Sequence, residues 1–515
     1  MIIAVPDSNS EDTMVTDRGI VPARGGQVKI LHDEQITMLH EATVEILGDV
    51  GIKLLHDDAL EIMEGHGCSV DFDQKIVRMP EEILMRYVAK APSEIILNGR
   101  DSKYDIRLDA SSDVYVMGGA GALHVIDLDG TRRPSTLQDL RDLTRLEDTL
   151  ENMDIAHFLV TPQDIPQDGF EMITFAEMLK NNTRNFYALV GGCREGLSHE
   201  LEMAAVAAGS IDEVKNRPFF VAGLCIISPL TQRRDFIEEL LACGENNIPV
   251  YIEADALAGG TTPFTISGTA VEINANVLSA VALAQMVNPG APCIYASSSG
   301  ILDMKSLNLG GAAPESTLLH MAQAQLAHHY GLPYYGSNTP DSKLPDTQMG
   351  YESALHFLGC ALGGVNIIHV AIGNLGMMSL ANYEKCLIDN EILGATFRML
   401  QGIDCSRDAI GLDAFREVRH SGHFLETEHA LKYLRRDRWE PELTDRNNWD
   451  TWQMLTGGKN MQERAREKAI KILEEHRPIY IGEKEAREID KIAKAAQREI
   501  TEIRRRDMTW GRSSQ

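Results

Sequence analysis

The polar side chains most suited to chemistry are concentrated between residues 336 and 352. This segment reads GSNTPDSKLPDTQMGYE and follows a short apolar run that is typical of a strand. Carboxylate, amine and amide groups this close in sequence can orient a small ligand and exchange protons with it. Asp346 could equally cap the helix that follows. We predict that the catalytic residues are Asp341, Lys343 and Asp346, and that Gln348 and Glu352 contribute to substrate binding.

Eight short apolar runs could supply the strands that position this segment. Helical patterns such as 199–209 and 270–286 lie between the runs, which occur at 114–117, 155–160, 186–190, 219–227, 249–254, 292–297, 332–336 and 366–372. This alternation is typical of βαβ units and a parallel sheet. We therefore predict an α/β fold of the (β/α)8 TIM-barrel type, although a doubly wound sheet would give similar spacing. The segments that leave the runs are rich in Gly, Ser and Pro, and barrel active sites lie there.

The remaining segments suggest additions to the barrel. We predict an N-terminal helical cap over residues 1–111, a TIM-barrel catalytic domain over 112–384 and a C-terminal helical extension over 385–515. HVIDLDGT, directly after the first strand, predicts an inserted hairpin with an Asp-Gly turn. Acidic and basic residues alternate from Met461 to Arg506, which predicts a solvated helical tail that helps to form a homo-oligomer.

The composition limits the possible partners. The formal charge of −27 disfavours nucleic acid and anionic membranes and tolerates a cationic ligand. No basic and apolar signal segment is visible at the start, and no run approaches the ~18 apolar residues that span a bilayer, so we expect a cytoplasmic protein. Eight cysteines occur without a CxxC pair and are expected to be reduced and structural.

Several segments, in this order and spacing, resemble the trimethylamine methyltransferase family. They are GGTTP at 259–263, QMVNPGAP at 285–292, PYYGSNTPDSKLPDTQMGYE at 333–352 and GHFLETEH at 422–429, with DRNNWDTW and RAREKA after them. The resemblance covers most of the chain. It implies a TIM barrel that presents a methylated amine to the Co(I) of cobalamin, a corrinoid, carried by a separate cognate corrinoid protein. No tightly bound cofactor is then expected in this chain, and no Asp-x-His-x-x-Gly corrinoid motif is found in it.

One departure from the family pattern bears on the substrate. Members that contain pyrrolysine place it in the glycine-rich segment before the DSK triplet, where this chain has Ser337, Asn338, Thr339 and Pro340. The resemblance therefore implies a quaternary amine such as glycine betaine, proline betaine, carnitine or γ-butyrobetaine. A quaternary ammonium already carries the charge that lets the amine leave, so the protein needs only to hold and align it.

A quaternary ammonium binds to aromatic rings and carboxylates, so we expect such side chains around it. The strand ends supply Tyr251, Glu253, Asp255, Tyr295, Tyr334 and Tyr335. A single tyrosine in a strand is more often core packing. For the carboxylate of a betaine, hydrogen-bond donors are needed, and we select His369 and Asn374 near the end of the last strand, with Lys343, His124 and Arg194 as further candidates.

Three alternatives stay open. Trimethylamine could be the methyl donor, or the chain could bind methylated amines without catalysis. A metal-dependent lyase or hydrolase would need a metal at His420, His423 and His429, but their spacing fits neither HExxH nor a Cys/His zinc pattern. We therefore predict no metal site. GGAGA at 118–122 is not GxGxxG, and no GxxxxGK[ST] occurs, so nucleotide binding is unsupported.

Overall fold

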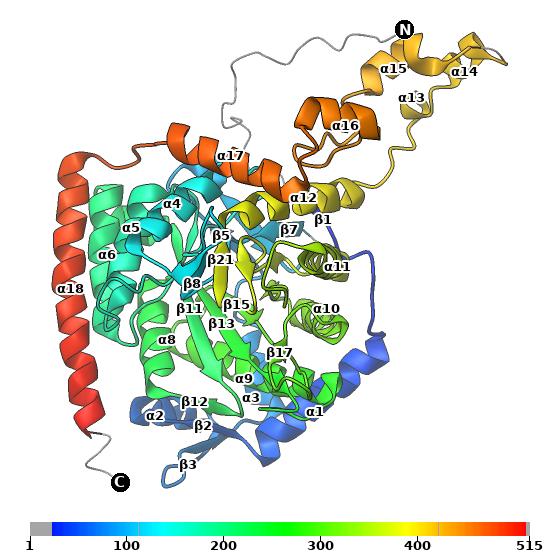
Figure 1. Ribbon diagram of the computed structural model, residues 1–515. Coiled ribbons are helices and arrows are strands. Elements are labelled where there is room, and N and C mark those ends of the chain that lie inside the picture. Colours follow the sequence, from blue (N-terminus) through cyan, green and yellow to red (C-terminus); the bar gives the residue numbers. More distant parts are fainter. Residues whose placement is uncertain (1–22, 112, 421, 511–515) are drawn as a thin grey trace.

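A core of parallel strands surrounded by helices makes up a mixed α/β fold (Figure 1). The computed structural model describes residues 23–111, 113–420 and 422–510 of the chain. The parallel strands are β7 (Asp113–Val116), β10 (Phe186–Ala188), β11 (Phe220–Ile227), β13 (Val250–Asp255), β15 (Cys293–Ser297), β18 (Tyr334–Gly336) and β19 (Ile367–Ile368).

The pairing of these strands follows their order in the chain. β10 pairs with β11, β11 with β13, β13 with β15, β15 with β18, β18 with β19, and β19 with β7, always in parallel. Between β7 and β10, Ile155 makes a single parallel bridge to Met117, and Ala156 makes one to Phe186. Parallel strands are covered on both faces, which explains why the runs are almost wholly apolar.

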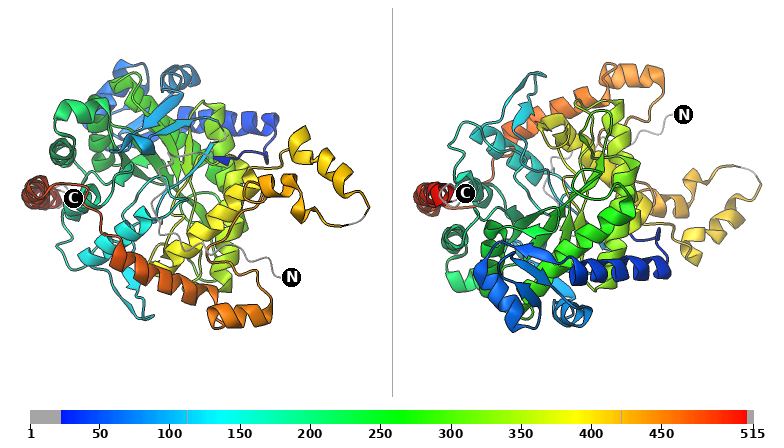
Figure 2. Two further views of the ribbon diagram at one scale, coloured as in Figure 1. Left: turned by 90° about the horizontal axis from the view of Figure 1, so that it is seen from above. Right: turned by 90° about the horizontal axis from the view of Figure 1, so that it is seen from below.

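Helices that alternate with the strands cover the outside of this core, as the two views of Figure 2 show. They are α4 (Leu137–Asp148), α5 (Phe170–Asn181), α6 (Arg194–Ala208), α7 (Ile211–Asn216), α8 (Arg234–Asn246), α9 (Ile266–Val287), α10 (Pro314–His329) and α11 (Thr347–Gly363). The pattern expected at 270–286 falls within α9, and the pattern at 199–209 falls within α6 apart from Gly209, the residue that caps its C-terminus.

Helix α9 has the length and hydropathy of a membrane span. Within the described part of the chain it alone meets both criteria, and 94% of its most apolar window is buried inside the protein. It is thus a core helix. Its sequence is not an uninterrupted apolar run, because Glu272, Asn274 and Asn276 lie within it, and all three of these side chains are buried.

Two expected strands are shorter than the sequence suggested. Residues 155–160 form isolated bridges instead of a strand. Their carbonyl groups accept hydrogen bonds from the glycine-rich loop after β7, where Gly121 N donates to Phe158 O and Ala122 N donates to Leu159 O, and this pairing does not continue as a regular ladder. The run 366–372 forms β19 over two residues only. Val370 then takes a positive φ of 46°, which turns the backbone out of the strand.

In the N-terminal part, where residues 1–22 of the predicted helical cap lie outside the described residues, short strands accompany the helices. Its helices α1 (Asp33–Asp49), α2 (Asp57–Gly65), α3 (Glu81–Val88) and the 3-10 turn η1 (Ser102–Tyr104) are interspersed with strands β1 (Ala23–Arg24), β2 (Ile52–Leu54), β3 (Ser69–Asp71), β4 (Ile76–Arg78), β5 (Glu94–Leu97) and β6 (Ile106–Asp109). β2 pairs with β12 (Thr231–Gln232), directly after β11. The tight turn between β3 and β4, with Lys75 at φ 58°, was not recognised as a hairpin in the sequence.

Two small sheets are built from segments that follow the core strands. The predicted hairpin after the first strand is confirmed as β8 (His124–Ile126) and β9 (Arg132–Pro134), with Gly130 at φ 86° in its turn. It joins β20 (Asn374–Leu375) and β21 (Leu380–Asn382). The other sheet contains β14 (Leu257–Ala258), β16 (Gly300–Leu302) and β17 (Leu309–Gly310).

After residue 382 the described chain is helical. Its elements are α12 (Tyr383–Leu400), α13 (Arg407–Ile410), α14 (Leu412–Val418), η2 (Phe424–Glu426), α15 (Glu428–Tyr433), α16 (Trp449–Thr456), α17 (Met461–Glu475) and α18 (Glu483–Trp510). The charged tail is only partly solvated. One face of α18 buries Ile489, Ala493, Ala496 and Ile500 near α5 and α6, and Arg504 pairs with Glu171 at its end.

Candidate active site

The strongest concentration of ionisable and aromatic side chains lies where β11, β13, β15 and β18 end. In the parallel register Glu253 is flanked by Cys225 on one side and Ala296 on the other, and Ala296 is followed by Tyr335. Side chains in one such row share a face of the sheet. The thiol of Cys225 and the carboxylates of Glu253 and Asp255 come within 4.8 Å of one another.

These three groups differ in their access to solvent. Cys225 and Asp255 are exposed, whereas Glu253 is 3% exposed. Desolvation by the surrounding protein raises the pKa of Glu253, and the neighbouring Asp255 charge raises it further. Desolvation also raises the pKa of Asp255. Two carboxylates held together in this way favour either a shared proton or a cation.

Among the described residues, no basic side chain pairs with Glu253 or Asp255. The hydrogen bonds of Glu253 are with neutral groups: Ser298 Oγ donates to it, Tyr187 Oη lies 3.5 Å away and Cys225 Sγ 3.6 Å away. Asp255 accepts from the Ser298 backbone N at 3.0 Å. Glu253 is buried, and a buried negative charge is normally paired. A cationic ligand would supply that pairing.

Ser298 links Glu253 to His369. The Ser298 hydroxyl has one proton, and it donates this proton to Glu253 Oε1. The 3.1 Å contact between Ser298 Oγ and His369 Nδ1 must therefore use an Nδ1 proton of the imidazole. That leaves His369 Nε2 as a bare acceptor when Glu253 is ionised. Protonation of Glu253 can reverse both hydrogen bonds, so the chain of three residues relays the charge state of Glu253 to His369.

A layer of stacked rings lies beside these groups. Tyr335 lies between Tyr251, with centroids 4.5 Å apart, and His369, at 4.4 Å. Tyr187 stacks on His157 at 4.3 Å and on Tyr251 at 5.7 Å. All five rings are buried. The layer supplies aromatic surface next to two carboxylates, which is the surround that an alkylated ammonium prefers.

Gly223 makes this layer possible. A Cβ at position 223 would lie 1.7 Å from the ring of Tyr187. Since no side chain can approach that closely, only glycine lets Tyr187 lie across β11 toward Glu253.

Three polar atoms of the layer have no hydrogen-bond partner among the described residues: Tyr251 Oη, Tyr335 Oη and His369 Nε2. Burial raises the pKa of both tyrosines and lowers that of His369 well below its usual range, so all three groups are neutral at pH 7. Unpartnered buried polar atoms are rare in folded proteins and each is costly. Their clustering beside Glu253 makes this strand end the candidate ligand site.

Tyr295 and Tyr334 were predicted in the substrate site and lie elsewhere. Tyr295 is in register with Ile252 and Tyr334, so these two rings occupy the opposite face of the sheet from Tyr251 and Tyr335. The Tyr295 hydroxyl donates to Gln323 of α10 at 2.5 Å, and the Tyr334 hydroxyl lies 2.8 Å from a ring nitrogen of His320 in the same helix. Both tyrosines join strands to helices.

Asn374 holds two loops together. Its side-chain oxygen accepts from Ala120 N at 2.6 Å, and its amide donates to Ala120 O at 3.2 Å. These bonds tie the loop after β19 to the glycine-rich loop after β7 and leave little free for a substrate.

The segment predicted to be catalytic is a structured turn. Asp346 caps α11, where it accepts from Met349 N at 3.1 Å, which confirms the capping role considered from the sequence. Glu352 accepts from Ser342 N at 3.0 Å and from the Gln348 amide at 2.7 Å. Asp346 and Glu352 therefore stabilise the turn, and Gln348 does so through its hydrogen bond to Glu352.

Asp341 and Lys343 lie on the outer part of this turn. Asp341 accepts from Gly311 N at 3.1 Å, and desolvation raises its pKa. Lys343 is exposed and donates to the carbonyl of Asp341 at 2.7 Å. The turn contacts the loop after β19 because Gly376 N donates to Ser342 O.

Four residues of the site escaped the sequence analysis: His157, Tyr187, Cys225 and Ser298. Cys225 and Ile227 are exposed at alternate positions of an otherwise buried strand, a period of two that FFVAGLCII does not reveal by hydrophobicity. Ser298 lies in the SSSG segment already assigned to a strand end. Its place at a strand end was the one feature that could have identified Ser298 as a site residue. Tyrosine and histidine in apolar runs are ordinary core residues, so Tyr187 and His157 gave no such indication.

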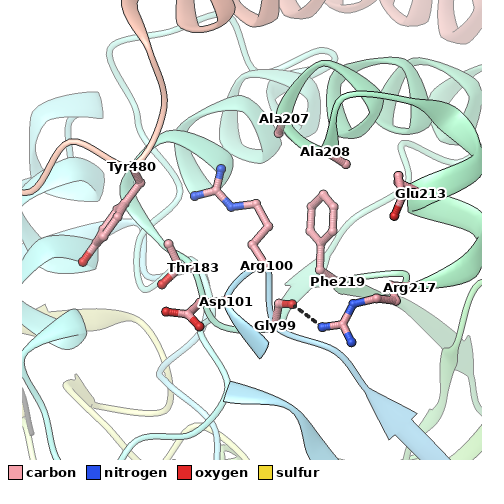
Figure 3. A pocket seen from close by; sticks show the side chains of 10 residues that line it. All are labelled: Gly99, Arg100, Asp101, Thr183, Ala207, Ala208, Glu213, Arg217, Phe219 and Tyr480. Carbon is pink, nitrogen blue, oxygen red and sulfur yellow. Dashed lines mark hydrogen bonds between the residues drawn. The ribbon is translucent and has the colours of Figure 1, made fainter. Parts of the chain in front are cut away.

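A separate pocket of about 360 Å³ lies at the other end of the strands (Figure 3). Its lining residues Thr183 and Phe219 precede β10 and β11. Arg100 donates to Asn182 O at 2.7 Å, and desolvation lowers its pKa to about 10. Arg217 of the same pocket pairs with Asp105. The pocket shares no residue with the strand-end site.

The family model described as trimethylamine methyltransferase (MTTB) matches residues 8–500. The chain belongs to this family. It is accordingly a methyltransferase, as the relatives below are named.

Two relatives come from Desulfitobacterium hafniense. The trimethylamine methyltransferase MttB of strain DSM 10664 / DCB-2 is 31% identical over 90% of this chain and 93% of its own length. The glycine betaine methyltransferase of strain Y51 is 33% identical over 82% of this chain and 88% of its own length. Among solved structures, the Methanosarcina barkeri monomethylamine methyltransferase (MtmB) aligns with a TM-score of 0.49 and 10% identity, covering 85% of this chain and 92% of that one.

Proposed function

We propose that this methyltransferase takes a methyl group from a quaternary amine and passes it to the Co(I) corrinoid of a separate protein. Glycine betaine, proline betaine, carnitine and related compounds are the proposed donors. Family membership supports methyl transfer from a methylated amine. The absence of pyrrolysine from the segment 337–340 supports a quaternary donor over trimethylamine.

The observation that carries the proposal is the pair Glu253 and Asp255, which have no basic partner among the described residues and lie beside stacked aromatic rings. An alkylated ammonium is a large, weakly hydrated cation that binds to aromatic faces and carboxylates together. It would pair with the charge that the protein leaves uncompensated. Cys225 completes a donor set that a divalent metal could also use, so metal content is a necessary control.

The proposed step needs no acid or base. The C–N bond breaks with its electron pair on nitrogen, the methyl carbon bonds to cobalt, and Co(I) is formally oxidised to Co(III). The amine leaves neutral and takes a proton later from solvent. The work of the chain is to hold the cation, align one methyl group with the open strand end and exclude competing nucleophiles.

Each part of the site has a proposed role. Glu253 and Asp255 bind the ammonium, Tyr251 and Tyr335 offer aromatic surface and hydroxyls, and His369 accepts or donates one hydrogen bond to the substrate. The turn with Asp341 and Lys343 forms a wall of the site or part of the surface that receives the corrinoid protein. Asp346, Gln348 and Glu352 position that turn.

We also propose that the fold is a (β/α)8 barrel and that residues 112–384 form the catalytic domain. The ring of parallel pairings, with single bridges at 155 and 156, supports this arrangement. Residues 1–111 and 385–515 would be additions to the barrel. The cytoplasm is the proposed location, where thiols and Co(I) stay reduced.

The test is a donor panel with the purified chain and reduced Co(I) cobalamin, followed by corrinoid absorbance and repeated with the cognate corrinoid protein. Trimethylamine, glycine betaine, proline betaine, carnitine, γ-butyrobetaine and choline are compared. Turnover with a quaternary amine and none with trimethylamine supports the proposal. Turnover with trimethylamine alone overturns the choice of donor, and binding without any turnover favours a non-catalytic binding protein.

A further inference from the structure

Residues 403–436 form an arm that projects from the body of the protein, in gold in Figures 1 and 2. It contains α13, α14, η2 and α15. The side-chain hydrogen bonds and ion pairs described for this arm join residues within it, such as Asp404 to Arg436 and Asp408 to Lys432. The arm is therefore a small folded unit that receives little support from the body.

The internal order of the arm comes from a few contacts. The rings of Phe415 and Phe424 meet edge to face at 5.2 Å, and His429 stacks on Tyr433 at 4.5 Å. His429 Nε2 also lies 3.0 Å from the carbonyl of Ala409. These contacts connect α14 to η2 and α13 to α15. They hold the shape of the arm and leave most of its apolar side chains outside.

Eight large apolar side chains of the described arm are exposed, with exposed fractions from 38% to 88%. They are Ile403, Ile410, Leu412, Phe415, Phe424, Leu425, Leu431 and Leu434. If a large side chain offers about 150–250 Å², the arm presents on the order of 800 Å² of apolar surface. That is about what one partner contributes to a standard protein interface. An exposed apolar surface of this size marks an interaction site.

The charge of the arm indicates what covers it. Residues 403–436 contain six basic and six acidic residues, whereas the whole chain has a formal charge of −27. Two copies of so acidic a chain repel each other over most of their surfaces. A neutral, apolar projection is the part through which two copies can meet without that penalty.

We propose that the arm binds a second copy of this chain and forms a symmetric oligomer with it. In a two-fold arrangement each copy gives one arm and receives one. The two arms, with the surfaces that they cover, would then bury more than ~2,000 Å², which is the range of permanent homodimers. Apolar interfaces of this kind are typical of subunits that stay associated.

The test is the mass of the full chain in solution, measured by sedimentation velocity over a micromolar concentration series. The wild-type chain is expected to be an oligomer. The double variant Leu425→Asp with Leu431→Asp, at side chains 64% and 72% exposed, is expected to weaken association by at least ~100-fold. The matched control is Ile479→Asp in the connection between α17 and α18. Ile479 is 88% exposed, as Ile403 is in the arm, and the control should stay oligomeric.

Hydrogen exchange on the wild-type chain gives a readout without a variant. Amides of 403–436 should lose protection on dilution, in step with dissociation of the oligomer. A monomeric wild-type chain, or an oligomer that survives the double substitution, overturns the proposal. Protection of the arm only after addition of the corrinoid protein also overturns it and assigns the arm to that partner.

Discussion

Replacing Glu253 with glutamine removes one negative charge from the site while keeping its shape. Glu253 is 3% exposed and accepts a hydrogen bond from Ser298, which the glutamine oxygen can still accept. At an effective dielectric constant of about 20, a carboxylate about 5 Å from an ammonium nitrogen contributes about 3 kcal/mol. At pH 9, where Glu253 is ionised, Glu253→Gln should therefore weaken binding of a quaternary amine by about 150-fold.

The stability of the Glu253→Gln variant, unlike its affinity, should stay the same or increase. The folded-state pKa of Glu253 is raised, so its contribution to stability is present at low pH and is lost as the pH rises through that pKa. Glutamine does not ionise and avoids this loss, so the variant should unfold at the same or a higher temperature at pH 8. A fold that is damaged by the substitution would show the reverse.

Glu200→Gln is the matched control. Glu200 lies on α6, is fully buried and also has a raised pKa, and no residue in the described part of the chain hydrogen-bonds to its carboxylate. It should gain stability at pH 8 like Glu253→Gln but keep the affinity of the wild-type chain. The assay is calorimetric titration with tetramethylammonium and with the best donor of the panel, beside thermal unfolding. Equal affinity of Glu253→Gln and wild type would refute the cation-binding role of Glu253.

Three further predictions concern the site and the residues packed around it. Affinity for tetramethylammonium should increase from pH 5.5 to 9, because the raised pKa values of Glu253 and Asp255 keep them partly protonated at low pH, and titrations that show constant or falling affinity would contradict this. Gly223→Ala should lower stability by about 1–3 kcal/mol in urea unfolding and reduce turnover, because the methyl group of the alanine would overlap the ring of Tyr187. Unchanged unfolding would show that the ring of Tyr187 does not need a glycine at position 223. Tyr295→Phe should lower the free energy of unfolding by about 1–3 kcal/mol with no change in ligand affinity, because it leaves the buried hydrogen-bond partner of Tyr295 unsatisfied. Tyr251→Phe should weaken ligand binding without loss of stability. The opposite pattern would place Tyr295 in the ligand site and give Tyr251 the structural role.

The order of strands and helices could be predicted from the sequence because apolar runs and helical patterns alternate regularly. The hairpin after β7 could be predicted from its Asp-Gly turn. The short strands of the N-terminal part could not, because three or four residues carry too little periodicity to separate strand from loop. The irregular run 155–160 looked like a strand because its residues are buried, although its pairing is with a glycine-rich loop.

The site could be predicted only in part, for a reason visible in Tyr334 and Tyr335. Successive residues of a strand point to opposite faces, so one of the two had to face the ring layer and the other the helices. Which one does so depends on the register with β15, where Ala296 pairs with Tyr335. Register between distant strands is not encoded in the spacing of a single chain segment. For the same reason, the sequence could not show that Tyr251 lies in the site and that Tyr295 does not.

The segment 336–352 attracted the catalytic prediction because it is rich in polar residues. In the structure several of those groups satisfy backbone donors of the turn, as Asp346 and Glu352 do. Glu253 is less conspicuous in sequence, since only Asp255 accompanies it in an otherwise apolar strand. Its unpaired charge becomes evident only when the neighbouring strands are in place.

The central claim is that a methyl group moves from the nitrogen of a quaternary amine to cobalt. The most direct measurement is a single turnover with a donor ¹³C-labelled on one N-methyl group, the cognate corrinoid protein in its Co(I) state and NMR detection of the label. We predict that the label leaves nitrogen and appears on the corrinoid, with the demethylated tertiary amine as the other product, and that Glu253→Gln slows this transfer. Label that stays on nitrogen while the donor binds normally would contradict the account.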